Sequence, residues 1–140
     1  MLIWAHGLWG SPNGSKVTAI RESGIEVVSP DFNNMELEQR IDILNELVSN
    51  KKVVLAGSSY GGLACALVAQ QQPEQIKAML LLAPALHLPE SPNNVPENLV
   101  APKDLPITII HSTTDEIVPI SASQDYIGRT GNNINLIKVE

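Results

Sequence analysis

The sequence has one cysteine and no long apolar run, and each shortage excludes a class of protein. Because Cys65 is the only cysteine, no disulfide can form within the chain, and this predicts a reducing, cytoplasmic compartment. No apolar run approaches the ~20 residues that a helix needs to span a bilayer. The N-terminal residues lack the basic start and the long apolar stretch of a signal peptide.

Positive charge is also scarce. Nine Lys and Arg residues stand against fifteen Asp and Glu residues, which gives a net charge of −6. Nucleic acids and anionic membranes are therefore not expected as partners, since both require a clustered positive field. With 44% hydrophobic and 17% charged residues, the composition is that of a globular protein, and the length predicts a single domain over residues 1–140.

Short apolar runs alternate with helix-like segments along the whole chain. The runs expected to be strands cover residues 2–5, 25–28, 53–56, 77–82, 106–111 and 134–139. The segments expected to be helices cover residues 15–23, 36–49, 62–72 and 120–127, with Asn34 as the cap of the second. Continuous apolar strands separated by helices predict an α/β fold, with a doubly wound, mostly parallel sheet of about six strands and helices on both faces.

One irregular region interrupts this alternation, between Pro84 and Pro106. It contains six prolines, among them Pro92, and is too rich in proline for a long helix. We expect it to pass over the carboxyl ends of the strands, where folds of this class bind their ligands.

The motif Gly57-Ser58-Ser59-Tyr60-Gly61 lies between a predicted buried strand and a predicted helix. A serine on such a sharp turn adopts a strained backbone and exposes its hydroxyl, while the flanking glycines let neighbouring backbones pass. This pattern predicts a nucleophile elbow with Ser59 as the catalytic serine. The alternative is a glycine-rich turn that holds phosphate, although no lysine follows Gly62 as a P-loop requires.

A serine nucleophile also needs backbone donors for the oxyanion that develops during reaction. The residue after the nucleophile, Tyr60, is expected to offer its N–H at the start of the helix. A second N–H is expected from the loop His6-Gly7-Leu8-Trp9-Gly10, which follows the first strand. By position Leu8 is the expected donor, and Trp9 is expected to form a wall of the substrate pocket. The alternative for this segment is a plain turn.

An acid for the catalytic triad is predicted at Asp115. This residue follows the strand that ends at His111, and it comes after the serine in chain order. The alternative is an aspartate that caps a helix. Asp104 precedes its strand and Asp125 lies in a helix-like segment, so neither is expected to face the serine.

The base of the triad is missing from its expected position. The order serine, acid, histidine requires a histidine beyond Asp115, but no histidine follows His111. His6 is expected to be structural, and neither His87 nor His111 has a simple path to Ser59. A helix that should cover the last strand is absent as well. We expect a truncated protein whose histidine and final helix lie beyond Glu140.

Together these motifs resemble the α/β-hydrolase fold superfamily over essentially the whole chain. The opening His6-Gly7-Leu8-Trp9-Gly10-Ser11-Pro12 is similar to small bacterial esterases of the YqiA type, which have almost no lid domain. The resemblance implies hydrolysis of carboxylesters or thioesters. It also implies that Ser59 is the nucleophile, Asp115 the triad acid, and Leu8 and Tyr60 the oxyanion donors.

The sequence thus predicts a serine hydrolase that acts on small ester or thioester substrates through an acyl-enzyme intermediate. No metal and no organic cofactor is called for, and the oligomeric state is left open. The alternative is a non-catalytic protein of the same fold that binds a ligand or partner in the same cleft. The missing base favours this alternative, while the elbow, the oxyanion loop and the acid disfavour it.

Overall fold

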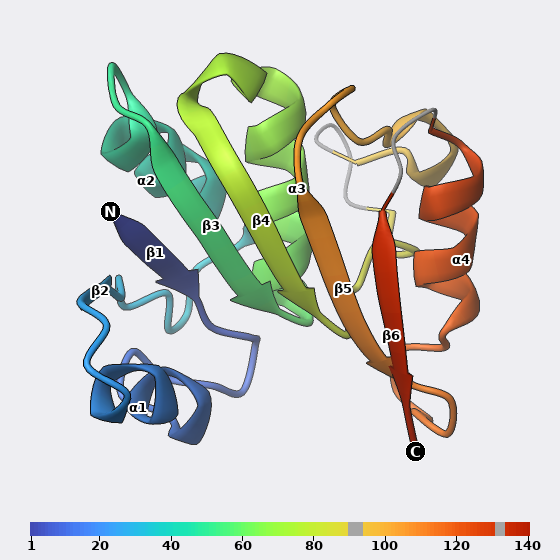
Figure 1. The fold of residues 1–140 in the computed structure, drawn as a ribbon, viewed down its shortest axis with the longest axis horizontal. Coiled ribbons are helices and arrows are strands. Elements are labelled where there is room, and N and C mark those ends of the chain that lie inside the picture. The colour runs from blue at the N-terminus through green and yellow to red at the C-terminus, as the bar shows by residue number, and fades with distance from the viewer. Residues whose placement is uncertain (90–93, 131–133) are drawn as a thin grey trace.

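The protein is built on one parallel sheet of six strands in the order β2-β1-β3-β4-β5-β6 (Figure 1). This computed structural model describes residues 1–89, 94–130 and 134–140. The strands are β1 (Leu2–Ala5), β2 (Val27–Val28), β3 (Val53–Ser58), β4 (Ile76–Leu82), β5 (Ile107–Ser112) and β6 (Asn135–Val139). The described helices are α1 (Ser15–Glu22), α2 (Leu37–Val48), α3 (Tyr60–Gln71) and α4 (Ser121–Gly128), with 3₁₀ turns at Pro73–Gln75 and Pro96–Asn98.

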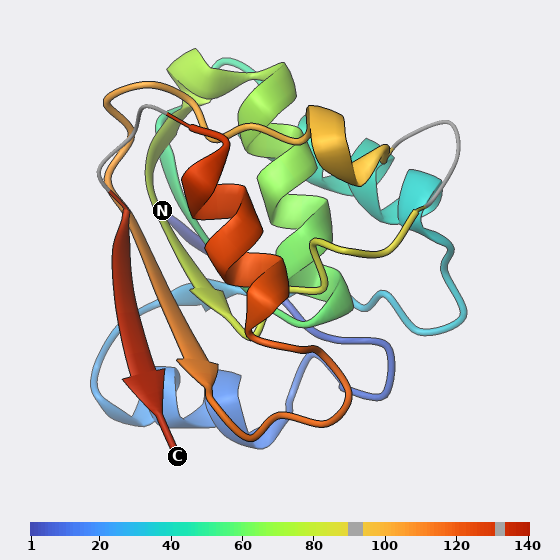
Figure 2. The same cartoon turned by 90° about the vertical axis from the view of Figure 1, so that its right-hand side faces the viewer.

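Helices cover the sheet on both faces, as expected for a doubly wound fold. On one face Val17 of α1 packs with Trp4 and Ala56 in a small buried cluster. The residues next to them on the same strands, such as Ile3 and Leu55, point to the opposite face and join the main core. The main core includes residues of α2, α3 and α4, and Figure 2 shows α3 and α4 standing together on that side of the sheet. Because neighbouring strand residues alternate between faces, β1, β3 and β4 contribute residues to both clusters.

The predicted α/β fold with six strands is therefore confirmed, and all neighbouring strands of the sheet pair in parallel. The boundaries of three elements differ in an informative way. Strand β3 extends to Ser58, and α3 begins at Tyr60 rather than residue 62, so that Ser59 alone forms the turn between them. Strand β2 is shorter than predicted, because this edge strand pairs with β1 only through Val27 and Val28.

The predicted cap of α2 was wrong. Its N-cap is Glu36 and not Asn34. The Glu36 side chain accepts a bond from the backbone of Gln39, whose side-chain Oε1 lies 2.9 Å from the Glu36 backbone nitrogen and accepts its N–H. This reciprocal pair satisfies two donors at the helix start, which a single asparagine two residues earlier cannot do.

All six strands run in the same direction, so their carboxyl ends meet at one edge of the sheet. The loop that begins at His6, the turn at Ser59 and the loop that contains Asp115 all leave from this edge. The segment after β4 starts here too: the Ala85 N–H donates to the Ser59 carbonyl, with 2.9 Å between the two atoms. The proline-rich region thus begins beside the elbow, but from Pro96 on it lies toward the amino ends of the strands, where the Val100 N–H donates to Gln70 near the end of α3. The expected passage over the carboxyl ends is wrong for these residues, and Pro92 lies outside the described residues. No helix in the described parts of the chain is long and apolar enough to cross a membrane.

Candidate active site

Ser59 occupies a strained turn between β3 and α3. Its φ of 53° lies in the left-handed region that non-glycine residues rarely adopt. Hydrogen bonds to both neighbouring segments hold it there: its N–H donates to the Leu82 carbonyl, and its carbonyl accepts from Leu63 and Ala85. Such strain persists only where the surrounding structure enforces it, and it is typical of functional sites.

Two glycines of the elbow are required by close backbone approaches. A Cβ atom at Gly61 would lie 2.1 Å from the Ala5 carbonyl oxygen and 2.5 Å from that of His6. A Cβ atom at Gly57 would lie 2.8 Å from the Gly61 carbonyl oxygen. The first turn of α3 therefore sits directly against the end of β1, and this contact brings the loop after β1 next to Ser59.

Ser59 opens into a hollow of about 410 Å³ at the carboxyl edge of the sheet. Leu8 and Trp9 line it from the loop after β1, and Tyr60 lines it from α3. Tyr60 is the first residue of α3, where the helix dipole favours negative charge. The structure therefore places four of the five residues predicted for the site, Ser59, Leu8, Trp9 and Tyr60, around one hollow. Their roles in catalysis remain predictions.

Most of the remaining wall is apolar. It includes Ala85, Leu88, Ile117 and Val118, and Ile117 is 85% exposed at the rim. Lys16 is the one side chain among the described lining residues that carries a permanent charge. An apolar hollow with few polar groups suits a small organic substrate.

Asp115 lies behind this wall and is not one of the described lining residues. Its Oδ1 accepts the backbone N–H groups of Ile117 and Val118, with distances of 2.9 and 2.8 Å. Both donors line the hollow, so the carboxylate is fixed to the wall that faces Ser59. Asp115 does not cap α4, because the N-cap of that helix is Ile120. The helix-capping alternative is therefore excluded, while the role as triad acid remains a prediction.

The structure fixes His6 in a supporting position. Its Nδ1 lies 2.7 Å from the Gly7 carbonyl oxygen and donates to it, and its Nε2 accepts the Phe32 N–H at 2.8 Å. This pair of bonds defines a neutral imidazole with its proton on Nδ1. Although Asp31 Oδ1 lies 3.9 Å from Nε2, no proton is present between them, so the contact is not an ion pair. His6 orders the loop that carries Leu8 and Trp9.

His111 is likewise committed to the structure. Its Nε2 donates to the Val118 carbonyl and its Nδ1 accepts from the Ser123 hydroxyl, each at 2.8 Å. Both nitrogens are used in a buried site, and Asp115 Oδ2 is 4.0 Å from Nε2, beyond hydrogen-bond distance. His111 therefore supports the wall near Asp115 rather than reaching Ser59.

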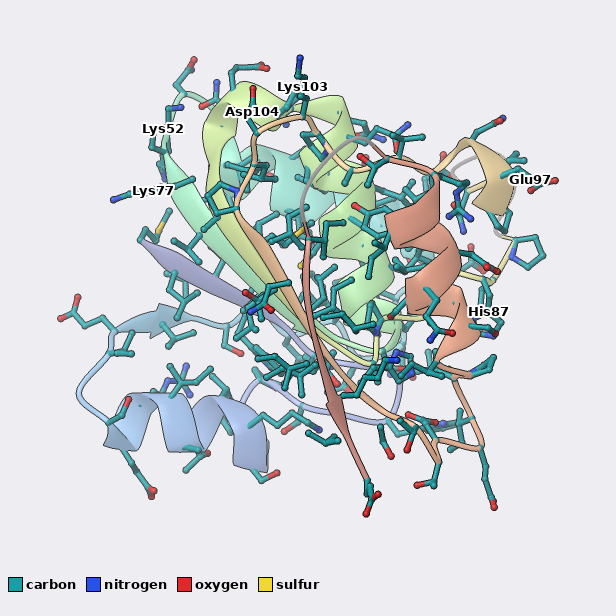
Figure 3. All side chains as sticks on the ribbon, turned by 45° about the vertical axis from the view of Figure 1, so that its right-hand side comes forward. Lys52, Lys77, His87, Glu97, Lys103 and Asp104 are labelled. Carbon is teal, nitrogen blue, oxygen red and sulfur yellow. The ribbon has the colours of Figure 1, made fainter. Side chains whose placement is uncertain are left out.

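His87 differs from the other two histidines because it lines the hollow that contains Ser59. Its Nδ1 is buried and has no hydrogen-bond partner within residues 1–89, 94–130 and 134–140. Figure 3 places His87 away from Asp104, which lies with Lys52, Lys77 and Lys103 at the opposite end of the molecule. Of the three histidines, His87 is thus the one whose ring belongs to the candidate site.

The sequence reasoning missed Arg40, a residue of α2 that is 0% exposed. Its Nη1 donates to the His6 carbonyl at 2.7 Å, and its guanidinium lies over the Tyr60 ring at 4.9 Å from the ring centroid. Burial lowers the pKa of Arg40 from its ordinary value, and the nearby Tyr60 partly offsets this effect. An arginine remains charged at neutral pH even so. A buried cation therefore contacts both segments from which the oxyanion donors are predicted to come.

Cys65, the single cysteine, has no part in the hollow. It is fully buried in α3, and its thiol points to the Ala56 carbonyl at 3.7 Å. Burial raises its pKa to about 12, so the reactive thiolate is scarce at neutral pH. The described residues contain no group of three or more His, Cys, Asp or Glu side chains arranged to hold a metal ion.

Comparison with known proteins defines the class. The chain superposes on a crystal structure from Xanthomonas campestris pv. campestris, described as a hydrolase of the alpha/beta superfamily. The two share 26% identity with a TM-score of 0.76, over 99% of this chain and 85% of that one. Est1E from Butyrivibrio proteoclasticus, solved with ferulic acid, shares 21% identity with a TM-score of 0.78, over 99% and 78% of the two chains. The monoacylglycerol lipase of Paleococcus ferrophilus shares 15% identity with a TM-score of 0.76, over 99% and 83%.

The last two likenesses show the fold alone. No curated protein sequence matches the chain. Residues 10–101, however, match the family model for the alpha/beta hydrolase fold, so the chain belongs to this family. The family and the Xanthomonas neighbour support a function of the hydrolase type.

Proposed function

We propose that the protein is a serine hydrolase that cleaves small carboxylester or thioester substrates. The observation that carries the proposal is the strained Ser59 turn, which faces a hollow that Leu8 and Tyr60 also line. A nucleophile and two prospective oxyanion donors thereby surround one space. The hydrolase family of the chain and the names of its structural neighbours, a lipase and an esterase among them, agree with this chemistry. The cytoplasmic location predicted from the single cysteine is part of the same proposal.

The proposed reaction has two halves. Ser59 Oγ attacks the carbonyl carbon as its proton passes to a general base, and the N–H groups of Leu8 and Tyr60 stabilise the oxyanion. The carbon–oxygen or carbon–sulfur bond then breaks, and the base returns the proton to the departing alcohol or thiol. Water, deprotonated by the same base, then attacks the acyl carbon; the bond to Ser59 Oγ breaks, the base returns the proton to Oγ, and the acid is released. No step requires a metal or an organic cofactor.

Asp115 and a histidine complete the proposed machinery. Asp115 would orient the base and stabilise its protonated form from the wall beside the hollow. Among the histidines, His6 and His111 have both ring nitrogens engaged, whereas His87 lines the hollow. In this family the histidine base follows the acid along the chain, whereas His6, His87 and His111 all precede Asp115.

A second candidate function is ligand binding without catalysis in the same hollow. The observation that favours it is that, in the part of the chain that the structure describes, no histidine forms a hydrogen bond with Ser59. The two candidates differ in one measurable respect. A serine hydrolase turns over an activated ester such as p-nitrophenyl acetate and loses this activity with Ser59, whereas a binding protein does neither.

Activity is expected to fall as the acyl chain lengthens. The hollow holds about 410 Å³, and Leu8, Trp9 and Ile117 leave its rim open, so long chains gain few contacts there. We expect kcat/KM to be highest for acetyl or butyryl p-nitrophenyl esters and to decrease toward decanoyl. A steady rise with chain length, measured below the micelle concentration, would contradict the small-substrate proposal.

Replacing Asp115 by asparagine is expected to lower kcat by about 10²- to 10⁴-fold, as the loss of a triad acid does elsewhere. The amide oxygen can still accept from Ile117 and Val118, so the loop is expected to keep its shape. Asp104→Asn is the matched control, because Asp104 lies at the opposite end of the molecule (Figure 3). Steady-state kinetics that give equal rates for Asp115→Asn and the control would remove Asp115 from the mechanism.

A further inference from the structure

The buried guanidinium of Arg40 has no role yet in the proposed chemistry. To the described residues it donates three hydrogen bonds, all to backbone carbonyls: His6 at 2.7 Å, and Phe32 and Met35 at 3.4 Å each. Within residues 1–89, 94–130 and 134–140 no carboxylate forms an ion pair with it. Burying a cation without a counterion is costly, so a protein retains one only where its contacts compensate.

Those contacts converge on the junction between the oxyanion loop and the elbow. The His6 carbonyl oxygen that Arg40 binds is also one of the two carbonyl oxygens that leave no room for a Cβ atom at Gly61. The guanidinium stacks over the ring of Tyr60, with 4.9 Å to its centroid, and over that of Phe32 at 5.3 Å. Phe32 in turn donates its N–H to His6. Arg40 thus contacts His6 in the oxyanion loop on one side and Tyr60, the residue after Ser59, on the other.

We propose that Arg40 is a positioning residue for the oxyanion hole. It fixes the peptide at His6 and the ring of Tyr60, and thereby sets the separation between the backbone N–H groups of Leu8 and Tyr60. The inference rests on the proposed serine-hydrolase function, since only that chemistry requires two converging donors.

Arg40 also contributes electrostatically. Its charge is not neutralised by a described carboxylate, and it lies in a buried environment where charges are weakly screened. The tetrahedral intermediate carries a negative charge that the ground-state ester lacks. The cation therefore stabilises the transition state more than the substrate, which is the requirement for raising kcat.

The test compares Arg40→Met, Arg40→Lys and the control Arg21→Met, which removes an exposed arginine of α1. Each variant is assayed with an oxoester and the matching thionoester, whose sulfur is a poor acceptor for oxyanion donors. We expect Arg40→Met to lower kcat for the oxoester by about 10²-fold, comparable to the loss of one oxyanion donor, with KM nearly unchanged. In Arg40→Met the preference for the oxoester over the thionoester should fall as well. Arg40→Lys should recover part of this preference. Arg21→Met should match the wild type in kcat and in the preference.

Equal losses on both substrates would overturn the proposal, because they indicate general damage to the fold. A second readout does not depend on activity: the amide resonances of Leu8 and Tyr60 in ¹H–¹⁵N spectra should shift in Arg40→Lys and stay in place in Arg21→Met. Unshifted resonances in Arg40→Lys would also overturn the proposal.

If the wild type hydrolyses neither ester, the serine-hydrolase proposal fails, and the amide shifts alone decide whether Arg40 positions these groups. Should Arg40→Met not fold, Arg40→Lys provides both readouts.

Discussion

Replacing Gly61 by alanine is expected to destabilise the protein severely, although it exchanges only a single hydrogen for a methyl group. The new Cβ would lie 2.1 Å from the Ala5 carbonyl oxygen, a backbone atom of β1 that has no flexible end to move. Relieving the clash requires α3 to separate from β1. We expect a loss of at least about 4 kcal/mol in the free energy of unfolding, which approaches the whole stability of a small domain.

Gly128→Ala is the matched control for this prediction. Gly128 ends α4, and no atom of the described residues, apart from its chain neighbours and the backbone of its own helix, lies within 4 Å of its ideal Cβ position. Alanine there should change stability by no more than about 1 kcal/mol. Chemical denaturation followed by circular dichroism measures both variants. A Gly61→Ala protein as stable as Gly128→Ala would show that the elbow does not sit against β1 as described.

Replacing Ser59 by alanine is expected to reduce ester hydrolysis by at least about 10⁴-fold, since the reaction then lacks its nucleophile. The fold should remain, because the three hydrogen bonds that hold this turn involve the Ser59 backbone and not its hydroxyl. Initial rates with p-nitrophenyl acetate, together with a thermal melt, separate the loss of chemistry from the loss of structure.

Ser58→Ala provides the control for this change. Ser58 is the last residue of β3 and lines the same hollow, but its backbone lies in the strand and not in the strained turn. Its replacement should leave kcat within about tenfold of the wild type, as expected for a residue that makes no bond in the transition state. Comparable losses in both variants would mean that the chemistry does not belong to Ser59.

The fold could be predicted from local patterns because its main signals are short-range. Apolar runs such as 53–56 and 77–82 predicted the central strands, and the elbow motif located the turn between β3 and α3. Boundaries were less predictable where backbone pairing decides them. Strand β3 continues through Gly57 and Ser58 because both pair with β4, which composition alone does not indicate.

The candidate site was predictable to the extent that it depends on chain order. Loops that follow parallel strands must gather at one edge, so Leu8, Ser59 and Asp115 were expected at the same end of the sheet. The sequence could not show that Asp115 lies behind the lining of the hollow, since that depends on the turn that its Oδ1 stabilises. Nor could it show which nitrogen of each histidine is engaged.

Arg40 illustrates a signal that was present but not used. The apolar positions Leu37, Ile41 and Leu44 recur at helical spacing, and residue 40 falls on the same face, three residues after the first and four before the last. A charged residue within such a stripe predicts a buried cation. Its partners, the His6 carbonyl and the Tyr60 ring, come from distant parts of the chain and required the structure.

The central claim is that Ser59 is an activated nucleophile. A fluorophosphonate probe tests it most directly, because the probe reacts with activated serines and the modified residue can be identified by peptide mass spectrometry. We expect a single adduct on Ser59, formed in the wild type and in Ser58→Ala and absent from Ser59→Ala. A folded protein that gains no adduct, or gains one at another residue, would contradict this role of Ser59 and favour a binding protein.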